Sequence, residues 1–200
     1  MLLIRFPLPI LLCASLLSAG CFAPRTIQQS PPPEAPSITL SSEQRTSPSG
    51  ELSARLPKGW VTLDAEKIES PLIFAVACNP TYTLSVIFSE APVDQTIRSR
   101  FDRDGEAGLI DISFERRKRR SNGRAVMVGE TEEFAIGRRR FNAYTYTTDS
   151  SQTLTRVAVF FTGHNLYECA MTQLSFTGGD IPDLPTLAYI HQIILGGVEW

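Results

Sequence analysis

The fold class follows from residues 140–175, which read RFNAYTYTTDSSQTLTRVAVFFTGHNLYECAMTQLS. The segment holds three runs rich in β-branched and aromatic residues, and such residues favour strands. Turn-type triplets separate the runs, Asp149-Ser150-Ser151 first and Gly163-His164-Asn165 second. A fourth run precedes them at residues 125–134. We therefore predict a four-stranded antiparallel meander, with strands at residues 125–134, 140–148, 153–162 and 166–175.

Four shorter strands are expected before the meander, in two adjacent pairs. Turn residues divide each pair, Pro57-Lys58-Gly59 in the first and Asn79-Pro80-Thr81 in the second. The expected strands are residues 51–56, 60–63, 72–78 and 82–88.

Two segments show helical rather than alternating spacing of apolar residues. In residues 93–120 we expect Gly105 and Gly108 to break the helix into two pieces. Asp183 is a candidate N-cap for residues 184–195. This order predicts an α+β fold in which helices cover an antiparallel sheet. A small closed β-barrel with a flanking helix is the alternative, because the strand count alone permits it.

Three features resemble the PsbP-like α/β/α sandwich superfamily, which includes DcrB-like bacterial lipoproteins. They are Leu56-Pro57-Lys58-Gly59-Trp60, the late hairpin ending in Leu166-Tyr167-Glu168-Cys169, and the C-terminal amphipathic helix. The resemblance spans residues 51–196. It implies an assembly-factor or accessory role, and it carries over no functional residue because no family site motif is present.

The N-terminus has the pattern of an export signal. A single Arg5 precedes an apolar run of about a dozen residues, too short for a membrane-spanning helix of roughly 20. Leu17-Ser18-Ala19-Gly20-Cys21 resembles the lipobox that is cut before the cysteine, with Ser18 in place of the usual large aliphatic residue. We expect residues 1–20 to be a lipoprotein signal peptide and Cys21 to carry the lipid. The alternative is an ordinary signal peptide that is cut elsewhere.

Residues 21–50 are rich in Pro, Ser, Thr and Gln and show no apolar periodicity. Such a stretch buries too little surface to offset its ordering entropy, so we expect a disordered tether after the lipidated Cys21. Residues 51–200 then form a single globular domain. Phe22 follows the cysteine, and by resemblance to enterobacterial sorting this favours the outer membrane, with the domain facing the periplasm.

Composition and motifs argue against catalysis. The 200 residues carry 19 basic and 21 acidic side chains, so no strong overall charge favours nucleic acid. The sequence has no HExxH, GxSxG, Walker A or GxGxxG pattern. His164 lies in a turn and His191 on the flank of the last helix, with no nucleophile beside either. We predict a protein that is not an enzyme and that uses no metal or cofactor.

Cys78 and Cys169 are the thiols that remain in the mature domain. Because an exported domain meets an oxidising compartment, we predict that they form a disulfide. The alternative is two separate buried free thiols.

Two runs of cations form a candidate anion-binding patch for lipid headgroups, an anionic envelope polymer or an acidic protein. The alternative is a solvated helix end whose charges are balanced by Glu130, Glu132 and Glu133. The cations are Arg116, Arg117, Lys118, Arg119, Arg120, Arg138, Arg139 and Arg140.

The leading hypothesis for function is a membrane-anchored envelope lipoprotein with a non-catalytic role in binding a protein or polymer. A small-molecule or lipid-binding module is the second. It would use a pocket between sheet and helices, as suggested by the aromatic residues Tyr144, Tyr146, Phe160 and Phe161.

Overall fold

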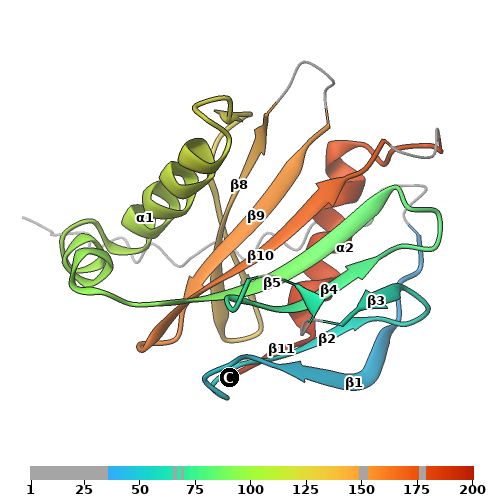
Figure 1. The fold of residues 1–200 in the computed structure, drawn as a ribbon, viewed down its shortest axis with the longest axis horizontal. Coiled ribbons are helices and arrows are strands. Elements are labelled where there is room, and N and C mark those ends of the chain that lie inside the picture. The colour runs from blue at the N-terminus through green and yellow to red at the C-terminus, as the bar shows by residue number, and fades with distance from the viewer. Residues whose placement is uncertain (1–35, 65–66, 69, 149–152, 176–178) are drawn as a thin grey trace, which may run out of the picture.

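The computed structural model describes residues 36–200 apart from 65–66, 69, 149–152 and 176–178. The expected signal peptide, Cys21 and the first part of the tether lie outside the described residues. The described residues form two antiparallel sheets and two helices (Figure 1).

The larger sheet has eight strands, of which seven follow one open path and the eighth, β7, pairs beside β6 along the same edge of β8. The order is β3 (Val61–Leu63), β4 (Ile73–Cys78), β5 (Leu84–Pro92), β10 (Asn165–Gln173), β9 (Thr155–Phe161), β8 (Arg139–Thr147) and then β6 (Val126–Met127) with β7 (Glu132–Ile136). The smaller sheet has the order β1 (Leu40–Thr46), β2 (Ser53–Pro57) and β11 (Val198–Glu199).

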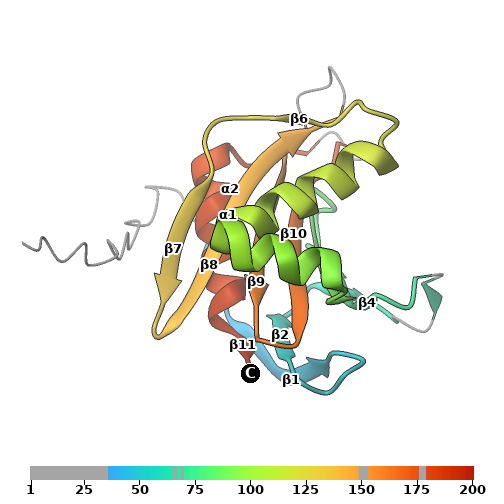
Figure 2. The ribbon, with the colours of Figure 1, turned by 90° about the vertical axis from the view of Figure 1, so that its left-hand side faces the viewer.

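The helices α1 (Gln95–Arg120) and α2 (Leu184–Gly196) cover opposite faces of the large sheet (Figure 2). Successive side chains of a strand point to opposite faces, and β10 shows this clearly. Its residues Tyr167, Cys169 and Met171 pack with α2, whereas Leu166 and Ala170 pack with α1. Each face therefore has its own apolar core.

The predicted α+β fold with an antiparallel meander is confirmed. Strands β7, β8, β9 and β10 follow one another as neighbours, and β4 and β5 form the predicted hairpin. The alternative of a small closed barrel is wrong, because in the described residues the sheet ends in β3 on one side and in β6 and β7 on the other. The expected strand 125–134 is divided into β6 and β7, with Gly129 between them at φ 74°.

The expected pairing of the first two strands is wrong. Strand β2 pairs with β1 and β11 in the small sheet, whereas β3 pairs with β4 in the large one. The next strand was the expected partner of residues 51–56, because residues 40–46 fall within the expected tether and residues 198–199 carry no strand pattern.

The predicted tether boundary at residue 50 is also wrong, because β1 begins at Leu40. Its later residues are polar and exposed, so a strand here has no alternating pattern to reveal it. The turn after it is firmly held. Ser47 donates its backbone N–H to the carbonyl oxygen of Leu52, and Ser49 donates from its backbone N–H and its hydroxyl to the Glu90 carboxylate, at 3.2 and 3.0 Å.

Gly105 divides α1 into two pieces, as predicted. Its φ of 63° and ψ of −147° lie in a region that a residue with a Cβ rarely adopts. The two pieces lie against each other, and Arg100 reaches Asp111 across them at 3.7 Å. A Cβ on Gly108 would come within 2.9 Å of the Arg100 side chain, so this second glycine permits the close contact.

The predicted disulfide is wrong, and both thiols are free. On β5, Cys78 lies opposite Ser85 and Cys169 lies opposite Phe88. The two cysteines are therefore two strands apart and out of register by an odd number of residues, which puts their side chains on opposite faces. From strand spacing and rise, their Cα atoms are on the order of 14 Å apart, beyond the roughly 7 Å limit for a disulfide.

A buried polar group lies between α2 and the sheet. His191, which was expected on the flank of the last helix, is fully buried, and its Nε2 lies 3.0 Å from the carbonyl oxygen of Cys169. Arg156, also buried, donates two hydrogen bonds to Glu132 at 3.1 and 2.8 Å. Burial first, and then the positive charge of Arg156, lower the pKa of His191 to about 3.

This shift predicts a loss of stability in mild acid. The unfolded chain binds a proton at His191 below pH 6.5, while the folded chain does not until about pH 3. The contribution of His191 to the free energy of unfolding is therefore fully present above pH 6.5 and is lost as the pH falls below this value. Between pH 7 and pH 5 we expect the free energy of unfolding to fall by about 2 kcal/mol through this group.

Urea unfolding at the two pH values measures the effect. His191→Gln should remove most of the difference, whereas His164→Gln, at the exposed histidine, should retain it. An unchanged pH dependence in the His191 variant would contradict the assignment.

Candidate functional site

The β7–β8 hairpin places three arginines around one cavity. Ile136 pairs with Arg139, so the turn consists of Gly137 and Arg138 alone. Gly137 has φ 62°, a conformation that short hairpin turns require and that glycine adopts readily. Arg138 thus projects from the tip, while Arg139 and Arg140 are successive strand residues on opposite faces.

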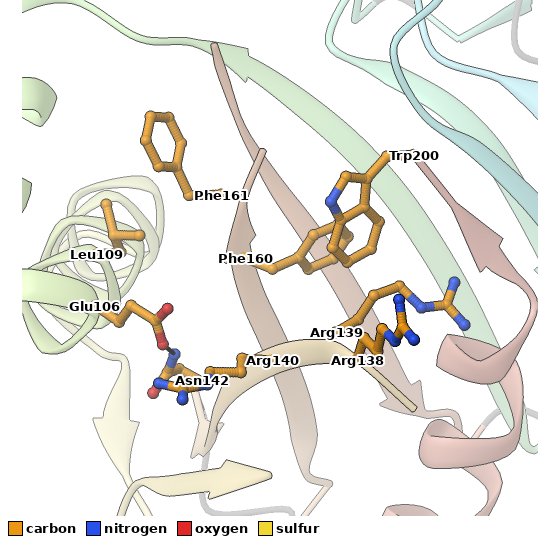
Figure 3. Close-up of a pocket in the computed structure, with 9 residues that line it drawn as sticks. All are labelled: Glu106, Leu109, Arg138, Arg139, Arg140, Asn142, Phe160, Phe161 and Trp200. Carbon is orange, nitrogen blue, oxygen red and sulfur yellow. Dashed lines mark hydrogen bonds between the residues drawn. The ribbon is translucent and has the colours of Figure 1, made fainter. Parts of the chain in front are cut away.

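The cavity has a volume of about 240 Å³, and its lining comes from both faces of the sheet (Figure 3). Asn142 and Phe161 lie on the face that α1 covers, whereas Phe160 and Trp200 lie on the other face. The lining residues are Glu106, Leu109, Arg138, Arg139, Arg140, Asn142, Phe160, Phe161 and Trp200.

Ring packing holds the apolar residues on each face. The Trp200 and Phe160 rings stack on the α2 face with centroids 5.2 Å apart and planes at 19°, and Phe161 packs on Phe101 at 4.9 Å on the α1 face. Leu109 is buried on the α1 face, whereas Trp200 is 44% exposed. Trp200 therefore offers accessible apolar surface on the α2 face, and the partly buried Phe161 on the α1 face.

The three arginines differ in how they are held. The Arg139 guanidinium lies 5.6 Å from the centre of the Trp200 ring and donates to the carbonyl oxygen of Gly196 at 3.3 Å. Arg140 has only a 4.0 Å ion pair with Glu133, and both side chains are more than half exposed. Arg138 has no hydrogen bond or ion pair with any described residue. Two of the three guanidiniums are thus available to a ligand.

Glu106 is the acidic group of the cavity. Its Oε2 accepts a hydrogen bond of 2.6 Å from Asn142 Nδ2. Three arginines and this one carboxylate line the cavity, so its net positive charge favours an anion. Such a surface attracts carboxylate and phosphate, because guanidinium pairs with both.

The other basic run, Arg116 to Arg120, lies elsewhere. Along the second piece of α1, Arg116 is ten residues beyond Glu106, which is about 15 Å at 1.5 Å per residue. The eight cations therefore do not form the single predicted patch. Arg116, Arg117 and Arg120 border a smaller cavity of about 90 Å³, where Glu90 and Glu168 offset most of the charge.

Arg117 is a structural residue rather than a free cation. It forms a hydrogen-bonded ion pair with Glu168, whose side chain is 9% exposed. Burial acts to lower the pKa of Arg117, but the attraction to Glu168 outweighs this and the pKa is raised. The neighbouring Lys118, Arg119 and Arg120 are exposed at the helix end, where cations stabilise the helix dipole.

The remaining sequence candidates lie outside the cavity. His164 pairs with Glu51 at 3.0 Å in an exposed turn. Tyr144 and Tyr146 are buried in the core beneath α1, where the Tyr144 hydroxyl lies 2.7 Å from that of Ser113. No three His, Cys, Asp or Glu side chains of the described residues come together as a metal site.

Sequence reasoning identified the arginines and the two phenylalanines of the cavity, but missed Glu106, Asn142 and Trp200. The neighbouring acids Asp102 and Asp104 stay outside the cavity, where Asp102 is exposed and Asp104 pairs with Arg100 and Arg103. Trp200 reaches the site because β11 pairs with β2. That pairing of a two-residue strand has no signal in the sequence.

Comparison with known proteins defines the fold class. No family model and no curated protein matches the sequence. Among solved structures, the Ran-binding protein Mog1p of Saccharomyces cerevisiae aligns with a TM-score of 0.54 and 10% identity, covering 82% of this chain and 96% of that one. The cyanobacterial PsbP (CyanoP) of Synechocystis sp. PCC 6803 aligns with 0.52 and 12%, covering 86% and 98%.

The chain thus has a PsbP/Mog1-like α+β sandwich fold, as the sequence resemblance implied. At sequence identities this low, the similarity supports a statement about the fold and none about function. Within the part of the chain that the structure describes, neither helix combines the length and apolar composition needed to cross a bilayer.

The paired Arg117 and the exposed Arg119 should respond differently to substitution. Arg117→Ala leaves the buried Glu168 without its partner, and we expect it to lower the free energy of unfolding by about 3–5 kcal/mol. Arg119→Ala removes an exposed cation and should change it by less than about 0.5 kcal/mol. Chemical denaturation of both variants at neutral pH tests this, and equal effects would contradict the structural role of Arg117.

Proposed function

We propose that this protein is an exported lipoprotein, anchored through Cys21 to the cell envelope, whose domain binds an anionic partner in the cavity at the β7–β8 hairpin. The role is accessory and non-catalytic, and the outer membrane facing the periplasm is the favoured location. The observation that carries the binding proposal is the cavity itself. Arg138 has no hydrogen bond or ion pair with any described residue, Arg140 has only an exposed 4.0 Å ion pair with Glu133, and the stacked rings of Trp200 and Phe160 line the same cavity.

The structural neighbours support a binding role without defining the partner. One of them is described as a Ran-binding protein, so this architecture serves protein recognition in at least one case. The arginines of the cavity indicate the chemical class of the partner. Guanidinium groups form charge-assisted, bidentate hydrogen bonds with carboxylate or phosphate, and these groups occur on acidic proteins and on anionic envelope polymers.

Cross-linked capture from envelopes tests the binding site. The full-length protein and Arg98→Gln should enrich the same partner, because Arg98 is an exposed arginine outside the cavity. Arg138→Gln/Arg140→Gln should lose at least about tenfold of that enrichment, since each charge-assisted hydrogen bond contributes roughly 1.5–3 kcal/mol. Capture should also weaken as salt rises. Equal capture by all three proteins would exclude the cavity as the partner site.

Intact-mass analysis of the full chain purified from its native membrane tests the anchor. We expect residues 1–20 to be absent and Cys21 to carry acyl chains, because tri-acylation supplies enough hydrocarbon for stable anchoring. Cys21→Ser should release the protein from the membrane fraction. A chain that retains residues 1–20, or that stays membrane-bound with serine at position 21, would contradict the anchored model.

A further inference from the structure

We infer that the edge of the large sheet formed by β3 rests on the lipid surface to which Cys21 is anchored, with Val61, Leu63 and Tyr82 against the apolar part of the lipid. This inference rests on the proposed function, because it requires the anchor. It goes beyond that function by assigning the side of the domain that faces the membrane.

Exposed apolar side chains gather at this edge. Val61 and Leu63 are two residues apart on β3 and therefore project from the same face, and they are 42% and 52% exposed. Tyr82, 46% exposed, lies in the turn after β4, where its backbone N–H donates to the carbonyl oxygen of Asn79 at 2.9 Å. Asn79 follows Cys78, the residue that pairs with Val61. The three apolar side chains thus belong to one corner of the sheet.

The edge itself is open. In the described part of the chain β3 pairs with β4 alone, so its other side presents unpaired backbone groups. Proteins usually protect such edges with charged residues or proline, and the three residues of β3 include neither. At a lipid–water interface these backbone groups keep hydrogen bonds with water, which they would lose in hydrocarbon. The contact is therefore interfacial, a location that tyrosine favours.

The path of the chain identifies lipid as what covers this edge. Thr39, just before β1, accepts a hydrogen bond of 2.8 Å from the backbone N–H of Lys58, which lies three residues before β3. Figure 1 shows β1 and β3 on the same side of the molecule, away from α1. Cys21 precedes Thr39 by 18 residues. A flexible chain of that length has an end-to-end distance of about 24 Å, so an acylated Cys21 holds this side close to the membrane.

The anchor also explains why a small apolar surface suffices. Three half-exposed side chains bind lipid only weakly by themselves, because affinity scales with the apolar area that is buried. The anchor makes their contact with the surface intramolecular, and effective concentrations then reach the millimolar range. Charges near β3 almost balance, with Lys58 and Lys67 against Asp64, Glu66 and Glu69. The contact should therefore form on lipid without net charge.

This orientation leaves the proposed binding cavity accessible. In the sheet order, β8 lies five strand intervals from β3, which is about 24 Å at the usual spacing. The β7–β8 hairpin is therefore remote from the lipid surface and available to an envelope partner.

The two tryptophans test the inference, because they lie in different parts of the domain. Trp60 directly precedes β3, whereas Trp200 stacks on Phe160 of β9, four strand intervals from β3. The acylated full chain, purified from its native membrane, is reconstituted into phosphatidylcholine vesicles with or without bromine in the acyl chains. We expect brominated lipid to quench Trp60, measured in Trp200→Phe, and to leave Trp200, measured in Trp60→Phe, unquenched.

Substitutions at the edge sharpen the test. In the Trp200→Phe background, Val61→Glu/Leu63→Glu should abolish the quenching of Trp60, because the carboxylates remain in water. Val126→Glu is the matched control, since Val126 is 60% exposed on β6 at the other edge of the sheet, and it should retain the quenching. The comparison of the two tryptophans needs no change at β3, so it decides the matter even if the double variant fails to fold.

Failure of the inference can be told apart from failure of the proposed function. Absence of Trp60 quenching, or equal quenching of Trp60 and Trp200, would overturn the inference. If Cys21 is acylated in that case, the anchor stands, and a partner strand or a second copy of the chain is left as the occupant of the edge. If Cys21 carries no lipid, the anchor is excluded and the inference fails with it.

Discussion

A row of stacked rings crosses four strands of the large sheet on the face beneath α2. Phe134 pairs with Phe141 and Phe160 with Tyr167 in register, and their ring centroids lie 5.6 and 5.7 Å apart. Phe141 and Phe160 join the two pairs at 5.1 Å. Trp200 packs onto this row, so the rings hold Trp200 in its position at the cavity. The Tyr167 hydroxyl reaches Ser49 at 3.1 Å, and this contact ties down the turn after β1.

Two ion pairs, each with a largely buried arginine, complement the apolar layers, one on each face of the sheet. Arg156 pairs with Glu132 beneath α2, and Arg117 pairs with Glu168 beneath α1. Burying a charged group is unfavourable unless it is paired. Each buried arginine therefore requires its glutamate to lie against it when the helix packs on that face of the sheet. The basic run at the end of α1 thus supplies one structural arginine, and the cations that remain for binding come mainly from the β7–β8 hairpin.

Several elements could be predicted because each depends on neighbours within a few residues. They are the meander, the β4–β5 hairpin, the glycine break in α1 and the capped terminal helix. The prediction of a disulfide between Cys78 and Cys169 failed for the opposite reason. It depended on strand order and on the face to which each side chain points, and β5 lies between their strands. The edge strand β1 was missed because an exposed strand needs no apolar alternation.

From local pattern alone, the sequence determined the α+β class, the order of most elements and the presence of two clusters of arginine. Periodicity and turn chemistry act over short separations, and they need no knowledge of the fold. Only the tertiary structure decided that Arg117 is largely buried against Glu168 while Arg138 has no ion pair among the described residues, and that Glu106, Phe161 and Trp200 line one cavity. Those relations depend on sheet register and helix docking, which bring together residues about a hundred positions apart in the chain.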